Sequence, residues 1–311
     1  MHKKLPESSD IFNIQGQMLT SEPMWRHTTF RVGGPADYFA IPKGEEDLRR
    51  LLTSARSADV PVFVLGDGSN LLVADEGIRG VVIDMHRFSE YRLEGDLLVS
   101  GAGLEVSDVA WESGTQGYAG LDYFYGMPGS VGGAVWMNAG CYGGEIADIL
   151  SWVEVMNFDG KVERIPMKKE DWDYKISPFQ SGSLVILRAA FRIESRDSAS
   201  LRAAMKERRD DREKKGHYRA PCAGSAFKNN RDFGSPSGVL IDSCGLKGRR
   251  SGGAAVSNWH GNILINDRGA KARDILALME EVAREVERST GFHMEKEVLA
   301  VGDWEADDGG R

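Results

Sequence analysis

The sequence predicts an α+β fold, in which short strands and helices follow one another without strict alternation. Two segments repeat apolar residues at helical spacing, and several short apolar runs are typical of buried strands. A hairpin signal, the turn Asp159-Gly160, joins two strands directly. A doubly wound parallel sheet would instead place a crossover helix between successive strands.

The N-terminal half is predicted to hold most of the strands. Residues 1–25 are polar and irregular, so we expect a lead-in without regular structure. A helix is expected over 45–58, because four apolar residues recur on one helical face. The other elements expected here are strands at 60–65, 80–84 and 97–101, a helix at 106–115, a hairpin over 153–165 and a strand over 183–193.

The C-terminal half begins after a polar segment at 196–201, where we expect a domain boundary. The charged run 206–215 mixes signs, which predicts the solvated face of a helix over 200–215. An amphipathic helix is expected from Ala272 to Gly291. Two strands are expected before it, at 254–257 and 262–266, and the tail 305–311 is expected to be disordered.

The composition argues against several kinds of partner. The net charge is −8 and no run of Lys and Arg forms a basic stripe, so we expect no nucleic-acid partner. The cysteines Cys141, Cys222 and Cys244 form no CxxC pair, so we expect neither a disulfide framework nor a metal site. No apolar run reaches the roughly 20 residues that span a bilayer, and the N-terminus lacks a secretory signal. We therefore expect a cytoplasmic monomer with no membrane partner.

Glycine is concentrated in two clusters. The chain has 37 glycines among 311 residues, well above the typical share of about 7%. One cluster is Gly66-Asp67-Gly68-Ser69-Asn70, and the other runs from Gly126 to Ala134 and continues to Asn138-Ala139-Gly140. Such loops let several backbone N–H groups approach one phosphate. Neither carries a Rossmann fingerprint or a Walker lysine. They predict either a dinucleotide site on another fold or simple tight turns.

Longer motifs surround these clusters. The first half contains HTTFRVGGPADY at 27–38, LGDGSNLLV at 65–73 and GMPGSVGGAVWMNAGCYGGEI at 126–146. The second half contains CAGSAFKN at 222–229 and MEKEV at 294–298. Shorter matches are Gly245-Leu246-Lys247-Gly248, the stretch 253–257, His260, Asn262 and Asn266. Together they resemble the UDP-N-acetylenolpyruvoylglucosamine reductase family over about residues 26–302.

This resemblance implies a fold and an activity. The fold would be an FAD-binding domain of the vanillyl-alcohol-oxidase (PCMH) type over 26–195, with subdomains of about 26–84 and 85–195. An α+β substrate-binding domain would follow over 196–304. The activity would be that of UDP-N-acetylmuramate dehydrogenase, which uses NADPH and FAD to reduce UDP-N-acetylglucosamine enolpyruvate to UDP-N-acetylmuramate for peptidoglycan. The short stretch before Ser225 resembles the shorter, type II-like branch of the family.

The resemblance also implies site residues. In the family a serine supplies a proton to the substrate and a glutamate assists, and Ser225 and Glu297 match them; Lys175 is the third expected catalytic residue. The expected substrate-binding residues are Lys215, Tyr218, Asn229, Arg249 and His260. The expected cofactor-binding residues are Gly66, Gly68, Ser69, Asn70, Gly126, Pro128, Gly129, Ser130, Gly132, Gly133, Asn138 and Gly140.

Several of these residues have a plainer interpretation that stays open. Ser225 could be a turn serine, and Glu297 could be a surface glutamate that alternates with Glu295 along a strand. Lys215 could be a charge at a helix end, and His260 could pack or donate a hydrogen bond instead of acting as an acid.

Two positions depart from the family pattern. The family carries arginine where this chain has Lys175, and lysine lacks the planar fork that binds a carboxylate with two hydrogen bonds. It also carries arginine where this chain has Leu299, so we expect weaker substrate binding or compensation by Arg249 or Arg250. Two other functions therefore stay open: an FAD-dependent sugar or alcohol oxidase of the same fold, and a flavin-binding protein that has lost reductase activity.

Overall fold

The computed structural model describes residues 11–304, which form two compact units. Unit 1 contains residues 11–20, 38–67 and 80–211, and unit 2 contains residues 21–37, 68–79 and 212–304. The divisions fall within β1 (Gln17–Pro23), β2 (Pro35–Ile41), β5 (Ile78–Asp84) and α6 (Ser198–Lys214). A four-stranded sheet has the order β1-β2-β5-β3.

In unit 1, α2 (Glu45–Ser57) precedes the short strand β3 (Val62–Leu65). The apolar face of α2 is fully buried, as its helical spacing predicted. β3 runs parallel to β5, with Val62 opposite Val81 and Leu65 opposite Asp84. Because the strands are parallel, the loops that follow β3 and β5 leave the sheet at the same edge.

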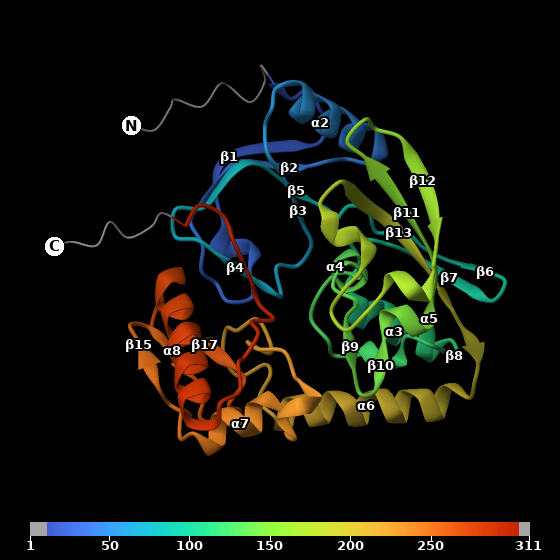
Figure 1. Ribbon diagram of the computed structural model, residues 1–311. Coiled ribbons are helices and arrows are strands. Elements are labelled where there is room, and N and C mark those ends of the chain that lie inside the picture. Colours follow the sequence, from blue (N-terminus) through green and yellow to red (C-terminus); the bar gives the residue numbers. More distant parts are fainter. Residues whose placement is uncertain (1–10, 305–311) are drawn as a thin grey trace. The chain divides into compact units, whose positions relative to one another are not determined.

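The largest sheet of unit 1 is antiparallel, in the order β12-β11-β13-β7-β6 (Figure 1). Its inner face packs on α3 (Val106–Thr115) and α4 (Val131–Trp136) around a shared apolar core. Its strands are β6 (Tyr91–Glu94), β7 (Leu97–Gly101), β11 (Leu150–Asn157), β12 (Val162–Pro166) and β13 (Leu184–Arg192).

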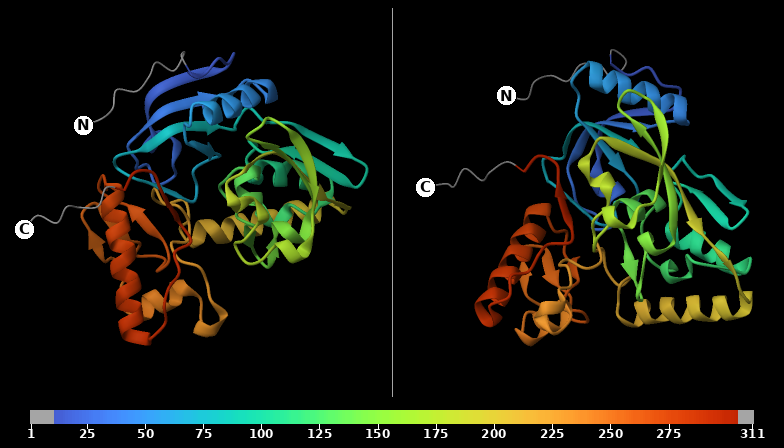
Figure 2. Two further views of the ribbon diagram at one scale, coloured as in Figure 1. Left: turned by 45° about the horizontal axis from the view of Figure 1, so that its top comes forward. Right: turned by 45° about the vertical axis from the view of Figure 1, so that its right-hand side comes forward.

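Short elements connect these parts of unit 1. They are β8 (Tyr118–Ala119), η2 (Asp122–Phe124), β9 (Gly140–Cys141), β10 (Gly144–Glu145), α5 (Ile146–Ile149), η3 (Lys169–Asp171), η4 (Pro178–Ser181) and β14 (Glu194–Ser195). The helix α6 follows them, and both views in Figure 2 show it as one continuous helix.

Unit 2 is built around α8 (Ala272–Thr290), which packs on a small antiparallel sheet of order β15-β16-β17 (Figure 1). β4 (Leu71–Val73) pairs in parallel with β18 (Leu299–Val301), so a segment from the first quarter of the chain joins the C-terminal part. The remaining elements are η1 (Met24–His27), η5 (Arg231–Phe233), α7 (Ser237–Ser243), β15 (Arg250–Ser251), β16 (Ala254–Val256) and β17 (Leu264–Asn266).

The predicted helices and strands are confirmed to within a few residues, including the end of α8 at Gly291, whose φ of 77° glycine adopts without strain. Two predictions were wrong. Part of the expected irregular lead-in is the strand β1, and Phe12 before it is buried. The charged run in α6 is not wholly solvated, because the Arg208 side chain is only 19% exposed and pairs with Asp122. The domain boundaries stay a prediction, and the tail 305–311 lies outside the described residues.

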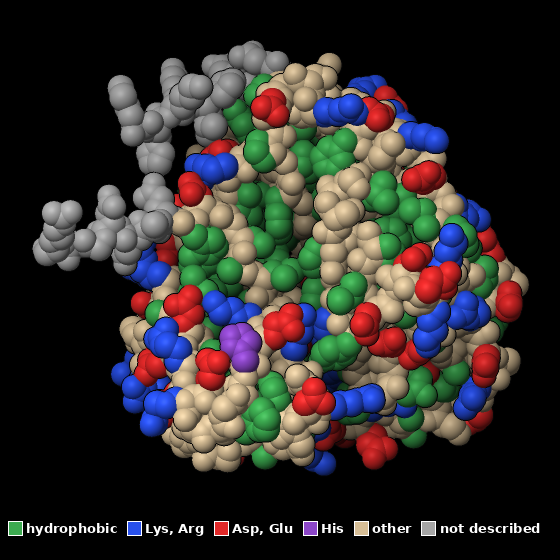
Figure 3. Space-filling model, viewed as in Figure 1, with side chains coloured by type: hydrophobic (Ala, Val, Ile, Leu, Met, Phe, Trp, Pro, Cys, Tyr) green, Lys and Arg blue, Asp and Glu red, His purple; other side chains and the backbone are tan. Residues whose placement is uncertain are grey.

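None of the helices between residues 11 and 304 combines the length and hydrophobicity needed to cross a bilayer. On the face drawn in Figure 3, Lys and Arg side chains are interspersed with Asp and Glu side chains. The three cysteines are free thiols.

Candidate active site

Two glycine-rich loops of unit 1 meet at Gly66 and Ser130. A Cβ atom added to Gly66 would overlap the Ser130 hydroxyl oxygen and lie 3.0 Å from the Ser130 Cβ. The Ser130 hydroxyl is held in place because it caps α4, accepting a hydrogen bond from the Gly133 N–H at 3.2 Å. Only glycine therefore fits at position 66 without a shift of the second loop.

The second loop presents backbone N–H groups. Gly129 has a φ of 129°, a value that residues other than glycine rarely adopt. The N–H groups of Val131 and Gly132 donate to carbonyls of residues 104 and 102, at 2.8 Å each. The N–H groups of Gly129 and Ser130 have no hydrogen-bond partner within residues 11–304. Since both residues are buried, these two donors are suited to an anionic ligand.

Asn138 is buried, and its amide is used within the protein. Its Nδ2 donates to the Asp173 carbonyl at 2.9 Å, and its Oδ1 accepts from the Ala147 N–H at 3.0 Å. The side chain therefore fixes the turn at 173–176, and the backbone N–H of Asn138 is also used, donating to the Val135 carbonyl at 3.1 Å.

That turn carries Lys175. Its φ is 60°, an uncommon conformation for a residue with a side chain. The turn is closed by two hydrogen bonds between Asp173 and Ile176, and Gln180 donates to the Lys175 carbonyl at 3.0 Å. The backbone of Lys175 is thus held by its neighbours in a strained conformation, as is common at functional sites.

A charged triad lies directly beside the first loop. His86 donates from Nε2 to Asp67 at 2.8 Å and from Nδ1 to Asp84 at 2.6 Å. These two hydrogen bonds, the one to Asp67 first, raise the pKa of His86 to about 10. His86 is therefore an imidazolium at neutral pH. Burial, followed by the charge of Asp67, raises the pKa of the nearby Glu105.

Unit 2 contains residues 68–70 of the first glycine-rich cluster. Gly68 has a φ of 61°, and a Cβ there would overlap the His27 carbonyl oxygen. Asn70 donates from Nδ2 to the Glu297 carbonyl at 3.1 Å, and the Leu299 N–H donates to the Asn70 carbonyl at 3.0 Å. The cluster is thus attached to the segment that contains the predicted catalytic glutamate.

Ser225 and Glu297 lie on neighbouring, hydrogen-bonded segments. The Glu297 N–H donates to the Ala226 carbonyl at 2.8 Å, and Phe227 is bridged to Lys296. Ser225 itself is half-buried and follows Gly224, whose φ is 69°. Backbone pairing therefore joins the segments that carry the predicted acid and its assisting carboxylate, although 72 positions separate the two residues in the sequence.

The structure distinguishes Glu297 from Glu295. Glu295 forms an ion pair with Lys228, and its side chain is 69% exposed. Glu297 is only partly exposed, and its N–H donates to the carbonyl of Ala226, the residue after Ser225. Glu295 is therefore the surface residue of the two.

His260 lies among basic groups. Its Nδ1 accepts a hydrogen bond from the Asn262 N–H at 3.2 Å, so the proton of the neutral ring is assigned to Nε2. Burial, followed by the charges of Lys215 and Lys247, lowers the pKa of His260. A neutral ring with an Nε2 donor, near two cations, is suited to binding an anionic substrate and not to giving up a proton.

The other predicted substrate residues lie elsewhere on unit 2. Tyr218 is 47% exposed, and Asn229 accepts a hydrogen bond from the Ser237 N–H at the start of α7. Arg249 donates to Glu281 on α8 at 2.6 Å, and Arg250 forms an ion pair with Asp267. Both arginines that could compensate for Leu299 are therefore already paired with carboxylates.

The comparisons with known proteins agree with this arrangement. Residues 216–301 match the family described as the C-terminal domain of UDP-N-acetylenolpyruvoylglucosamine reductase, and residues 36–166 match the FAD binding domain family. The reductase of Heliobacterium modesticaldum is 41% identical over 292 residues, which cover 94% of this chain and 93% of the relative.

The chain belongs to the UDP-N-acetylenolpyruvoylglucosamine reductase family. The Bacillus subtilis reductase is 37% identical over 289 residues, covering 92% of this chain and 95% of the relative. The crystal structure of the reductase from Thermus caldophilus has a TM-score of 0.77 at 35% identity and covers 93% of this chain and 99% of that one. The predicted family and the α+β class are confirmed.

Membership of the reductase family leaves the roles of individual residues as predictions. Sequence reasoning missed the triad of Asp67, Asp84 and His86. Asn262, which the sequence indicated only as part of a motif match, has a buried amide that donates to the Phe227 carbonyl and accepts from the Phe227 N–H, at 2.7 and 2.9 Å. A signal for the triad was present: Asp67 and His86 follow two apolar strands, and parallel pairing of those strands would bring both residues to one edge of the sheet.

Proposed function

We propose that this chain reduces UDP-N-acetylglucosamine enolpyruvate to UDP-N-acetylmuramate, with NADPH as the reductant and FAD as the bound cofactor. The observation that carries the proposal is the pairing of the Ser225 and Glu297 segments in a chain that matches these reductases along nearly its whole length. We further propose that it works as a monomer in the cytoplasm, in peptidoglycan precursor synthesis and hence in cell shape and division.

The glycine-rich loops fit an FAD diphosphate. The contact of Gly66 with Ser130 leaves no room for a side chain at position 66, so the two loops approach each other closely there. The unpartnered N–H groups of Gly129 and Ser130 are donors for phosphate oxygens. When bound, FAD takes a hydride from NADPH and supplies it to the vinyl carbon of the enolpyruvyl group.

Ser225 supplies the proton in this proposal. Hydride addition to the vinyl carbon leaves negative charge on the neighbouring carbon, which takes the Ser225 proton so that charge is balanced. A serine hydroxyl is a weak acid, so it acts only if it is held at the carbon and assisted by a neighbour. Glu297, on the hydrogen-bonded segment, is the assisting group, and the hydrogen bond from Asn70 to its carbonyl holds that segment in place.

Cationic and neutral donors bind the remaining parts of the substrate. Lys215 and the neutral His260 are proposed to contact the diphosphate, together with Tyr218 and Asn229. Lys175 is proposed to take the part of the family arginine at the substrate carboxylate. Arg249 would contribute only if it left its pair with Glu281.

Substitution of Ser225 by alanine tests the proposal in the FAD-loaded protein. We expect flavin reduction by NADPH to stay within about twofold of the unmodified rate. Reoxidation by the enolpyruvyl sugar nucleotide should fall by about 10³-fold or more, because the proton source is lost. Stopped-flow absorbance of the flavin measures the two steps separately. Ser289→Ala, at an exposed position of α8, is the matched control.

Other outcomes would overturn parts of this proposal. Rapid reoxidation of the Ser225→Ala flavin by substrate would remove the serine from the reaction. NADPH consumption with oxygen alone would favour the oxidase. An FAD-loaded protein that is inert to both would favour a flavin-binding protein without reductase activity, which the departures at Lys175 and Leu299 make worth testing.

A further inference from the structure

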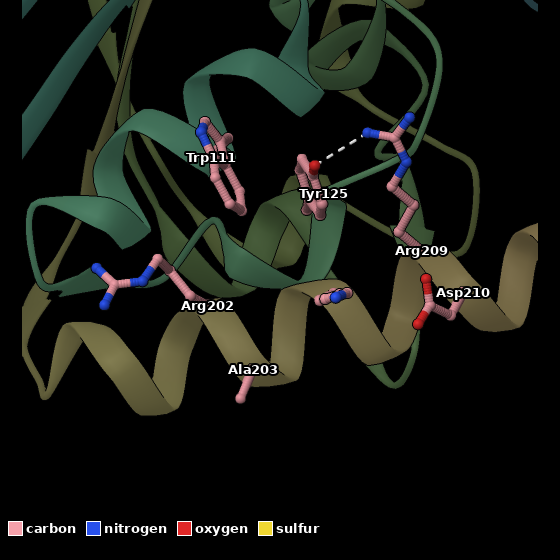
Figure 4. A pocket seen from close by; sticks show the side chains of 7 residues that line it. Trp111, Tyr125, Arg202, Ala203, Arg209 and Asp210 are labelled. Atoms are coloured by element: carbon pink, nitrogen blue, oxygen red, sulfur yellow. Dashed lines mark hydrogen bonds between the residues drawn. The ribbon is translucent and has the colours of Figure 1, made fainter.

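Unit 1 contains a pocket outside all the residues assigned above. Its volume is about 490 Å³, and it lies between α3, Tyr125 and α6 (Figure 4). Trp111 comes from α3, and Arg202, Lys206 and Arg209 come from α6. The three α6 residues are spaced four and three positions apart, so they lie on one face of the helix.

The aromatic wall of the pocket is a stacked pair. The rings of Trp111 and Tyr125 have centroids 5.0 Å apart and planes inclined by 29°. Trp111 is 39% exposed, which is unusual for so large an apolar side chain. A partly exposed indole beside a cavity is suited to stacking on a flat ring of a ligand.

The α6 side of the pocket is cationic. It presents three basic side chains and one carboxylate, Asp210, in a chain whose net charge is −8. Arg209 donates to the Tyr125 hydroxyl at 3.0 Å and so fixes that ring. Arg202 donates to the Ser198 hydroxyl at 3.3 Å, and its charge also interacts with the carboxylate of Asp197. The Lys206 side chain forms no hydrogen bond or ion pair with any residue between 11 and 304.

We propose that this pocket binds a nucleotide, with the base stacked on Trp111 and the phosphate groups held by Lys206 and Arg202. An aromatic surface together with cationic side chains is the combination that recognises a base and its phosphate. The nucleotide would be an additional ligand, since the pocket is lined by none of the residues assigned to FAD or the sugar nucleotide. Tyr125 directly precedes Gly126, so the ligand would contact the segment that leads into the second glycine-rich loop.

Isothermal titration of the FAD-loaded protein with ATP, adenosine and inorganic pyrophosphate tests the proposal. We expect ATP to bind, and adenosine and pyrophosphate to bind at least about tenfold more weakly, because each carries only half of the recognised chemistry. Trp111→Leu and Lys206→Gln should each weaken ATP binding by about tenfold or more. The matched controls are Trp25→Leu, at another exposed tryptophan, and Lys214→Gln, at an exposed lysine outside the pocket lining.

A variant at the predicted substrate site separates this pocket from the active site. ATP binding that survives Lys215→Gln but not Lys206→Gln supports the pocket. Absence of ATP binding at about 1 mM, or equal binding by Lys206→Gln and the unmodified protein, overturns it. If pyrophosphate binds as tightly as ATP, the stacking role of Trp111 is wrong. Lys206 is exposed, so its substitution keeps the test valid even if Trp111→Leu fails to fold.

Discussion

Gly66 is the residue at which the two glycine-rich loops of unit 1 meet. We expect Gly66→Ala to lower the free energy of unfolding by about 1–3 kcal/mol, because the added methyl group overlaps the Ser130 hydroxyl. FAD content after purification should fall with it. Chemical denaturation and the flavin absorbance of the purified protein measure the two effects.

Two further variants check the physical reason. Ser130→Gly in the Gly66→Ala background should recover much of the lost stability, because glycine is tolerated at a helix N-cap. Gly44→Ala is the control, since an added Cβ there meets nothing within 4 Å. Unchanged stability of Gly66→Ala would show that the second loop moves away at no cost.

The triad of His86 with Asp67 and Asp84 makes stability depend on pH in the alkaline range. The pKa of His86 is raised to about 10 from its usual 6.5. A raised pKa contributes stability that is fully present below about pH 6.5 and is lost as the pH rises through 10. Because the side chain is 47% exposed, we expect a contribution of about 1–2 kcal/mol, well below the unscreened value.

His86→Gln supplies the comparison. The unmodified protein should lose stability relative to His86→Gln between pH 7 and pH 10, measured by denaturation at several pH values. Glu105 also faces the triad, and its carboxylate interacts with the charge of His86. Parallel stability profiles for the two proteins across this range would contradict the assignment.

At the scale of the element, one face of α6 packs against the rest of unit 1. Arg208 pairs with the buried Asp122 at 2.7 Å and lies 4.4 Å above the Tyr123 ring, and the Tyr142 hydroxyl donates to its carbonyl. Met205 packs against Gly114 of α3. The adjacent face carries the cationic residues of the proposed nucleotide pocket.

Asp122→Asn should loosen α6, because it leaves the Arg208 charge without its carboxylate in a partly buried position. We expect a loss of about 2–3 kcal/mol in the free energy of unfolding and faster amide hydrogen exchange in residues 198–211. Glu207→Gln, at an exposed position on the same helix, is the control. Exchange that speeds up equally in both variants would argue against the ion pair as the attachment.

At the scale of the whole molecule, each unit is assembled from separate stretches of chain. The predicted FAD residues come from both: Gly66 and the second loop belong to unit 1, whereas Gly68 to Asn70 belong to unit 2. FAD that binds the folded chain and not the unfolded chain would stabilise the folded state. Removing it should therefore destabilise the protein by about 2.7 kcal/mol, relative to FAD present at 100 times its Kd.

Thermal denaturation of the apoprotein and the FAD-loaded protein measures this effect. For a chain of this size the melting temperature should fall by about 4 °C on removal of FAD, and should rise again as FAD is added back. A melting temperature that does not respond to added FAD would mean that FAD does not bind the folded chain.

Periodicity predicted the helices well, because the apolar faces of α2 and α8 are set by residues three and four positions apart. The prediction of an irregular lead-in was wrong at β1. The sequence of this strand is polar and mostly exposed, so the strand depends on hydrogen bonds to its neighbour β2 and has no apolar pattern of its own. The ranking of Glu297 over Glu295 came from a motif. The ion pair of Glu295 with Lys228, which sets the two glutamates apart, became visible only in the tertiary structure.

The sequence by itself determined the family, the α+β class and the position of the glycine-rich loops, because these depend on local spacing and on residue types that suit tight turns. Only the tertiary structure decided which residues meet. Asn70 contacts Glu297 across 227 positions, and His86 joins Asp67 because two strands run parallel. Such contacts depend on the pairing of distant segments, and no local pattern in either segment encodes its partner.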